Sequence, residues 1–282
     1  VLSGSGFVDM GGVFCRFGEA ASTIVRASVR SSLELACVSP AVDDGGALRV
    51  ALALNGDRAA FVPTNGSFEF YTAHDLVVSG VAPVAGPSTG GSLLNVSGHG
   101  FRSLGAVLCR FGWANRSVAA SLLSGSLLQC RSPPMRGPDW LGGSLIPGGL
   151  RESLEVSVNG QAYTSSFVGF MVFDQGSVHV SSLMPHGGPL SGGTRVLVMG
   201  AGFVDHNVHC VIGGELVRPT YVNATELLCT TPAWSSAATV SVEVTLNGDI
   251  SAHSVTSDGV GFRYFDGAEV GISSVSPAGG PT

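Results

Sequence analysis

The side chains best suited to chemistry cluster near position 210. His206, His209 and Cys210 fall together in "HNVHC", and imidazole and thiolate groups are common metal ligands. The alternative is a loop that carries two exposed histidines ahead of a disulfide-forming cysteine. We favour the loop, because the matching places before the other cysteines carry no histidine. The sequence therefore predicts no metal site.

Aspartates beside glycines are a second candidate for ion binding. Asp43 and Asp44 precede a double glycine, and Asp57 and Asp249 each follow an Asn-Gly pair. A calcium loop needs more oxygen ligands in a fixed array than these segments supply. We interpret all four as turn residues in contact with solvent.

The composition excludes several enzyme classes. All 14 basic residues of the 282 are arginine, so the lysine of a phosphate-binding loop, a Schiff base or a kinase is missing. Codon bias in a GC-rich genome would also explain the missing lysines. Arginines scattered among 20 acids, with a net charge of −6, make no basic patch for nucleic acid. No Gly-x-Ser-x-Gly or His-Glu-x-x-His segment occurs. We expect no catalytic residue and no cofactor.

The sequence also contains a pattern that occurs three times, and the elements it predicts must position any functional residues. It begins with a Gly-x-Gly-Phe segment, whose last two residues are Gly6-Phe7, Gly100-Phe101 and Gly202-Phe203, at spacings of 94 and 102 residues. A first cysteine follows (Cys15, Cys109, Cys210), and then a second cysteine ahead of a proline (Cys37, Cys130, Cys229). Each copy then has an alternating run that ends in Asn-Gly, and closes on an aromatic strand at 68–71, 170–173 or 262–265.

The alternating runs predict β-strands. In "VSVEVTLNG", residues 240–248, Val242 and Val244 share one face, whereas Glu243 and Thr245 share the other. This pattern predicts one buried face and one solvent-facing face. Asn-Gly predicts a tight hairpin in which both turn residues take positive φ. Many short strands in each unit of about ninety residues favour an all-β, two-sheet sandwich over a helical solenoid.

The repeat also selects a cysteine pairing. Six cysteines allow fifteen pairings, and spacing alone cannot choose among them. If each unit closes with its own residues, the pairs are Cys15–Cys37, Cys109–Cys130 and Cys210–Cys229. A loop of about twenty residues closed in this way contributes roughly 3 kcal/mol. Buried free thiols are the alternative; a zinc site is disfavoured because no Cys-x-x-Cys occurs.

The units share an opening segment that resembles a known family. It reads "VSGVAPVAGPSTGG" at 78–91, "VSSLMPHGGPLSGG" at 180–193 and "ISSVSPAGGPT" at 272–282. Together with the Gly-x-Gly-Phe segments and paired cysteines, it resembles the IPT/TIG domain, the immunoglobulin-like fold shared by plexins and some transcription factors. The resemblance covers essentially the whole chain and implies tandem immunoglobulin-like β-sandwiches arranged as beads on a semi-rigid rod.

The resemblance also implies domain boundaries. Residues 1–75 correspond to a repeat without its first strand, 76–175 and 176–268 to complete repeats, and 269–282 to the start of another. We therefore expect a window on a longer array, either an internal piece or one whose leader was removed. No run of 18 apolar residues occurs, so this segment predicts no membrane span.

Disulfides and glycosylation signals both favour the secretory pathway, and hence an extracellular or cell-surface location. Asn-x-Ser/Thr sequons begin at Asn65, Asn95, Asn115 and Asn223. Asn95 lies between Leu94 and Val96 in an alternating run, so it should point outward, and Asn115 and Asn223 fall in predicted loops. We expect two or three of these sites to carry glycans.

The second repeat has an insertion. From the second cysteine to the Asn-Gly asparagine it has 29 residues, against 18 in the other two repeats. The extra residues lie within 132–150 and include Met135, Arg136 and Trp140. Because Trp and Arg are frequent binding anchors, this loop is a candidate contact with another chain or repeat. The alternative is that Trp140 folds back over the end of its own sandwich.

These observations favour a non-enzymatic extracellular glycoprotein for spacing, adhesion or filament assembly on a cell or ciliary surface. The expected partners are other copies of the chain, neighbouring repeats and glycans, with no nucleic acid. A ligand-binding ectodomain of a plexin-like or fibrocystin-like receptor is one alternative, and an accessory module of a secreted carbohydrate-active enzyme is another. In the receptor alternative, particular loops would recognise a protein or a glycan, whereas the enzyme alternative needs a catalytic domain elsewhere in the full chain.

Overall fold

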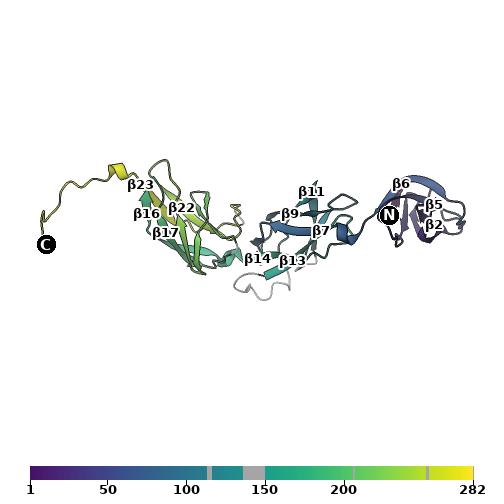
Figure 1. The fold of residues 1–282 in the computed structure, drawn as a ribbon, viewed down its shortest axis with the longest axis horizontal. Coiled ribbons are helices and arrows are strands. Elements are labelled where there is room, and N and C mark those ends of the chain that lie inside the picture. The colour runs from purple at the N-terminus through teal and green to yellow at the C-terminus, as the bar shows by residue number, and fades with distance from the viewer. Residues whose placement is uncertain (113–115, 136–149, 206, 252–253, 282) are drawn as a thin grey trace. The chain divides into compact units, whose positions relative to one another are not determined.

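The computed structural model describes residues 1–282 except 113–115, 136–149, 206, 252–253 and 282 (Figure 1). It divides into two compact units, Val1–Leu76 and Val77–Thr282. Strands dominate both units, and the helical segments of the described residues are 3₁₀ turns of three residues each. None of the described helices has the length and apolar character needed to cross a bilayer. The predicted all-β class is confirmed.

The first unit is built on a six-stranded sheet with strand order β1-β4-β3-β2-β5-β6. Its strands are β1 Leu2–Ser3, β2 Val13–Phe17, β3 Ile24–Ser31, β4 Glu34–Cys37, β5 Gly46–Ala53 and β6 Val62–Phe70. The 3₁₀ turns are η1 Ala21–Thr23 and η2 Ala73–Asp75. In β2 the alternating residues Val13, Cys15 and Phe17 are buried, as a strand with one core face requires. They pack with Leu35, Val50 and Leu52.

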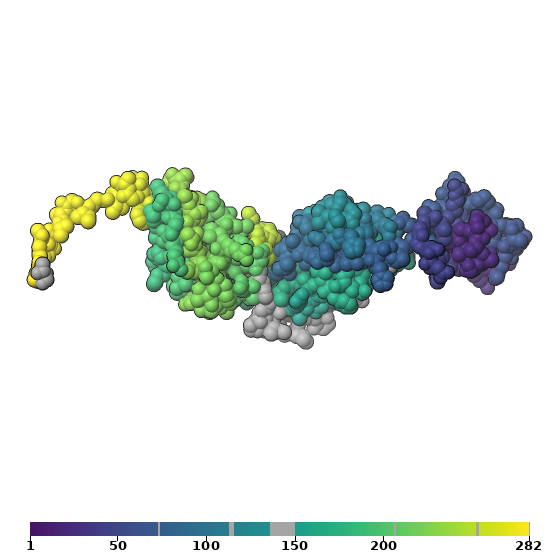
Figure 2. Space-filling model, viewed as in Figure 1, coloured from purple at the N-terminus to yellow at the C-terminus, as the bar shows by residue number. Residues whose placement is uncertain are grey.

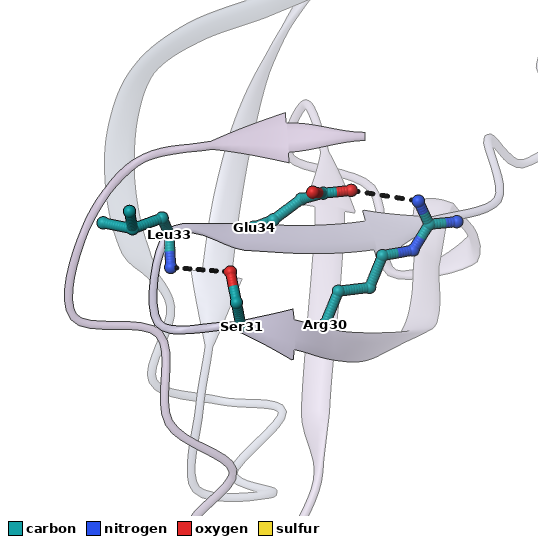
Figure 3. A network of polar contacts seen from close by, with 4 residues as sticks. All are labelled: Arg30, Ser31, Leu33 and Glu34. Carbon is teal, nitrogen blue, oxygen red and sulfur yellow. Dashed lines mark hydrogen bonds and ion pairs between the residues drawn. The ribbon is translucent and has the colours of Figure 1, made fainter.

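A hairpin joins β3 to β4 at the surface of this unit (Figure 3). The Leu33 amide donates to Ser31 Oγ at 3.1 Å across the turn. Arg30 Nη1 lies 3.0 Å from Glu34 Oε1, and the two side chains are 57% and 42% exposed. An exposed ion pair of this kind contributes at most about 1 kcal/mol.

The second repeat contains eight strands in the order β7-β9-β12-β11-β10-β13-β14-β8. They are β7 Val77–Ala82, β8 Ala85–Pro87, β9 Leu93–His99, β10 Leu108–Phe111, β11 Arg116–Ser124, β12 Leu127–Arg131, β13 Leu150–Ser157 and β14 Val168–Phe173. The first half of β11 pairs with β10 and the second half with β12. This shared strand connects the two layers of the sandwich.

The third repeat has two separate sheets, β15-β17-β21-β20 and β16-β23-β22-β18-β19. Its strands are β15 His179–Met184, β16 Gly187–Pro189, β17 Arg195–Ala201, β18 His209–Ile212, β19 Glu215–Val217, β20 Thr220–Asn223, β21 Glu226–Thr230, β22 Ala238–Thr245 and β23 Gly261–Phe265. The opening segment supplies β15 to one sheet and β16 to the other, where β16 pairs in parallel with β23. The turns η4 Gln175–Ser177 and η5 Gly267–Glu269 precede and follow this repeat.

Residues 270–281 contain no strand and are exposed along their whole length, as the yellow segment in Figure 2 shows. That they begin a further repeat stays a prediction.

The Gly-x-Gly-Phe motif has a steric explanation. A Cβ on Gly200 would lie 2.0 Å from the His179 carbonyl oxygen and 2.6 Å from the Phe203 ring, so only glycine fits there. Gly202 then takes φ +74°, a conformation that glycine adopts readily, and returns Phe203 to the core, where it is 1% exposed. The motif therefore directs a phenylalanine back under its own strand.

The prediction that one face of β22 is exposed to solvent is wrong at two positions. Glu243 and Thr245 are 8% and 0% exposed, although they alternate with buried Val242 and Val244 as the sequence predicts. The cause is the segment after the strand, which folds back over this face and pairs Val255 with Thr245. Both faces of the strand end are therefore covered.

The predicted tight Asn-Gly hairpin is also wrong. Gly56, Gly160 and Gly248 take φ between +74° and +80°, but none of the preceding asparagines has positive φ. Each asparagine Oδ1 instead accepts the amide hydrogen bond of the residue two positions on, at 2.9 to 3.2 Å. The motif thus makes an Asx-turn that opens a longer loop, because the next strand starts several residues later.

Candidate functional site

The six cysteines form three disulfides, each within one repeat. They are Cys15–Cys37, Cys109–Cys130 and Cys210–Cys229, with Cα–Cα distances of 6.4, 6.6 and 6.5 Å. These are the pairs that the repeat predicts, and the distances lie within the range for a disulfide. In each repeat the bond joins the strand after the Gly-x-Gly-Phe loop to the strand before the proline.

The candidate metal cluster is not assembled in the part of the chain that the structure describes. Cys210 is bonded to Cys229, and His209 Nδ1 lies 2.9 Å from the Asn207 carbonyl oxygen. His206 lies outside the described residues. Among the described residues, no three His, Cys, Asp or Glu side chains are grouped to hold a metal ion.

Aspartates accept hydrogen bonds within their own loops. Asp249 accepts from the amide and hydroxyl of Ser251, both at 2.9 Å, and Asp57 accepts from the Ala59 amide at 2.8 Å. In the first unit, the amides of Gly12 and Gly11 donate to Asp9 and lower the pKa of its carboxyl group. Hydrogen bonds of this kind stabilise turns, so these aspartates act as turn residues.

A pair of buried glutamates occupies equivalent positions in the second and third repeats. Glu243 accepts hydrogen bonds from Thr256 Oγ1 at 2.5 Å, the Asp258 amide at 3.1 Å and the Gly259 amide at 2.9 Å. Asp258 Oδ2 accepts in turn from the Val180 amide at 2.7 Å, which connects the loop to β15.

Glu155 repeats this arrangement in the second repeat, accepting from Thr164 Oγ1 and from the amides of Ser166 and Phe167. Neither glutamate was predicted from the sequence as a buried residue. The signal was a glutamate four residues before the Asn-Gly asparagine in two repeats; the first repeat has Ala51 there. These carboxylates fasten the loop onto the sandwich, so their role is structural.

The described sequon asparagines are accessible. Asn65, Asn95 and Asn223 are exposed, and Asn115 lies outside the described residues. Asn95 is on β9 between buried Leu94 and Val96, as expected, and its Oδ1 accepts from Gln129 Nε2 at 3.1 Å. Asn223 Oδ1 accepts from the amide and hydroxyl of Thr225, both at 2.8 Å. Each described sequon could therefore receive a glycan.

The insertion is described only at its two ends. Arg136 and Trp140 lie outside the described residues. Met135 is 7% exposed and its amide donates to the Ser88 carbonyl at 2.8 Å, so little of this side chain is left for a partner. Nearby, a groove of about 660 Å³ is lined by residues that include Arg116, Gln129 and Arg131. Arg131 Nη1 donates to the Gly91 carbonyl at 2.9 Å.

The second and third repeats are in direct contact. Asn247 Nδ2 donates to the Ala85 carbonyl at 3.1 Å. Ala85 and Phe173 of the second repeat belong to the buried apolar cluster of the third, and Met171 packs against it. The core of the third repeat therefore continues into the second.

Two segments of the sequence match the IPT/TIG domain, residues 76–170 and 179–264. Together they make up more than half of the chain. The chain belongs to the IPT/TIG family. Both matched segments of this IPT/TIG chain contain a disulfide, a buried glutamate and the Gly-x-Gly-Phe loop. The predicted family and the immunoglobulin-like fold are confirmed.

Several proteins that are similar to this chain are much longer than it is. Human Fibrocystin-L is 25% identical over 178 residues, which are 62% of this chain and 4% of the human protein. Mouse Fibrocystin-L is 31% identical over 71 residues, 25% of this chain and 2% of the mouse protein. The solved extracellular region of plexin A4 is 13% identical with a TM-score of 0.43, and the match covers 91% of this chain and 26% of that one. The chain thus spans a small part of each.

Proposed function

We propose that this chain is a non-enzymatic part of an extracellular protein, in which tandem IPT/TIG repeats act as a semi-rigid spacer on a cell surface. Three disulfides support an oxidising compartment, and exposed sequons support passage through the secretory pathway. Similarity to Fibrocystin-L supports a surface protein, because the family resemblance implies arrays on fibrocystin-like membrane proteins. A ciliary surface belongs to the same proposal.

The main support for the proposal is that the residues that recur between repeats have structural roles. The paired cysteines close the sandwich, the motif phenylalanines Phe101 and Phe203 fill its core, and the buried glutamates fasten a loop. Residues maintained in this way serve shape and stability. A buried cluster that continues from the third repeat to the second serves the same end, since it restricts motion at their joint.

The proposed partners are other copies of the chain, neighbouring repeats and glycans. Arg136 and Trp140 in the insertion remain our proposed contacts for adhesion or filament assembly, because large planar and charged side chains dominate binding energy at protein interfaces. Substituting Trp140 by alanine tests this proposal. Loss of assembly at unchanged thermal stability supports it, whereas lower stability with assembly intact contradicts it.

Secretion of the chain from eukaryotic cells tests the location. We expect a secreted product with no reactive thiol in the native or denatured state, and a mass that falls on treatment with an N-glycosidase. Single Asn→Gln variants at positions 65, 95, 115 and 223 then assign the occupied sequons. Free thiols in the secreted product, or retention with no glycan at any sequon, would contradict an extracellular role.

Electron microscopy of the same product tests the spacer role. We expect particles with separate beads, whose length varies less than that of a chain with a flexible linker inserted between the repeats. Equal variation in the two samples would contradict a semi-rigid spacer.

A ligand-binding ectodomain is the second candidate, and the groove beside β11 and β12 favours it. Arg116 and Gln129 offer hydrogen-bond donors there, which suit an anionic or hydroxyl-rich ligand. Binding to a panel of glycans, compared between the unaltered chain and Arg116→Ala, tests this candidate. Binding that is lost in the variant supports it.

A further inference from the structure

The Asn-Gly turn of the third repeat has a contact that reaches into another repeat. Asn247 Oδ1 serves its own turn, accepting from the Asp249 amide at 3.0 Å and from Thr245 Oγ1 at 2.8 Å. Its Nδ2 faces the second repeat and donates to the Ala85 carbonyl there at 3.1 Å. Nδ2 also donates to Ser254 Oγ within the third repeat, at the longer distance of 3.5 Å. The oxygen of this side chain thus serves its own turn, and the shorter bond of its nitrogen is made to the neighbouring repeat.

The three repeats allow an internal comparison of this turn. Asn55 and Asn159 make the same Oδ1 contact with the amide two residues on. Asn55 is exposed and Asn159 half-buried, whereas Asn247 is 2% exposed. Equivalent turns therefore differ in burial, and the most buried one is the turn in contact with Ala85.

The surface of the second repeat that contacts Asn247 is also more buried than the equivalent surface of the third repeat. Phe173 and Phe265 end the aromatic strands of the second and third repeats and occupy equivalent positions. Phe173 is 5% exposed and belongs to the buried cluster of the third repeat, whereas Phe265 is 40% exposed. Ala85, at 1% exposed, likewise corresponds to Gly187, which is half-buried. The end of the second repeat is thus covered in a way that the end of the third is not.

We propose that Asn247 and Phe173 form a lock that fixes the third IPT/TIG repeat on the second. The partner of the Asn-Gly turn is the opening segment of the preceding repeat, at residues 83–87, where the Ala85 carbonyl accepts the hydrogen bond from the asparagine amide. Phe173 excludes water from this hydrogen bond. Loss of the bond is therefore costly, because water cannot replace the missing partner. The surface around Gly187 and Phe265 is the equivalent receiving site for the Asn-Gly turn of another IPT/TIG repeat.

The proposed spacer function explains why such a lock would be useful, and the inference rests on it in that respect alone. The test measures the joint between the second and third repeats directly. The amides of Gly176, Ser177 and Val178 lie in the joint, where they bond to Asp174 and Gln175. Hydrogen exchange of residues 174–178, followed by mass spectrometry on the whole chain, reports opening of the joint.

Asn247→Asp is the main variant, because aspartate keeps the oxygen that serves the turn and replaces the donor to Ala85 by an acceptor. We expect exchange in residues 174–178 to be about tenfold faster, which corresponds to about 1.4 kcal/mol. Asn159→Asp makes the same change in the equivalent turn of the second repeat. It should leave exchange of residues 174–178 within twofold of the unaltered chain.

Phe173→Ala is the second variant and acts from the other side of the contact. It should also accelerate exchange in residues 174–178, whereas the matched Phe265→Ala should not. Equal exchange in the Asn247 and Asn159 variants would overturn the lock. So would faster exchange throughout β22 in the Asn247 variant with no effect of Phe173→Ala, because Asn247 would then only stabilise its own repeat. Neither result touches the secretion and disulfide tests of the spacer function.

Discussion

Glu243 offers the sharpest test of how the third repeat is held together. Replacing it by alanine removes the acceptor for the Thr256 hydroxyl and for the amides of Asp258 and Gly259. Glu243 and Thr256 are 8% and 7% exposed, so the Thr256 hydroxyl proton loses its acceptor inside the protein, although Oγ1 still accepts from the Val244 amide at 3.0 Å. Asp258 and Gly259 are exposed residues whose amides can recruit water.

The magnitude follows from these exposures. An unsatisfied buried donor costs about 1 to 3 kcal/mol, and a donor that water can reach costs less. One full loss and two partial losses give about 3 kcal/mol. For a domain of this size, that lowers the melting temperature by about 12 to 24 °C.

Differential scanning calorimetry of the whole chain measures the change, and hydrogen exchange of β22 and β18 assigns it to the third repeat. Glu34→Gln is the matched control, because it removes the exposed ion pair with Arg30 shown in Figure 3 and should cost at most about 1 kcal/mol. Glu155→Ala should reproduce the loss in the second repeat. If Glu243→Ala costs no more than Glu34→Gln, the buried carboxylate does not hold the loop, and the reasoning fails.

Three further predictions use the same calorimetric measurement. Gly200→Ala should cost about 3 kcal/mol, since its Cβ would overlap a backbone oxygen at 2.0 Å, whereas Gly193→Ala, at φ +77° in open space, should cost about 1 kcal/mol; equal costs would contradict the steric argument. Burial raises the pKa of Tyr264, so the folded state favours the neutral phenol, and stability that is present below about pH 10 should fall as the pH rises further; Tyr264→Phe should remove this dependence. Replacing both Cys210 and Cys229 by serine should cost about 3 kcal/mol, and a change below 1 kcal/mol would show that the disulfide adds little.

Much of the architecture is readable from local sequence, because it depends on spacing. The period-two pattern of Val242, Val244 and Leu246 places one face of β22 and the residue after it in the core, and the structure buries all three at 2% exposed or less. The cysteine spacing selects a pairing within each repeat for a similar reason, since a unit that repeats must close with its own residues. The Gly-x-Gly-Phe motif is visible in the sequence as a recurring segment, but the carbonyl oxygen that excludes a side chain at Gly200 belongs to His179 on the neighbouring strand β15.

Only the tertiary structure decides what covers a polar side chain. Glu243 follows the pattern of a solvent-facing residue, and it is buried because residues 255–259 return over it. Asn55, Asn159 and Asn247 occur in the same motif, and Asn247 is buried where its amide meets the Ala85 carbonyl, 162 residues away in sequence. Burial and hydrogen bonding of these side chains depend on residues that are distant along the chain. Local spacing carries no information about which of those residues packs against them.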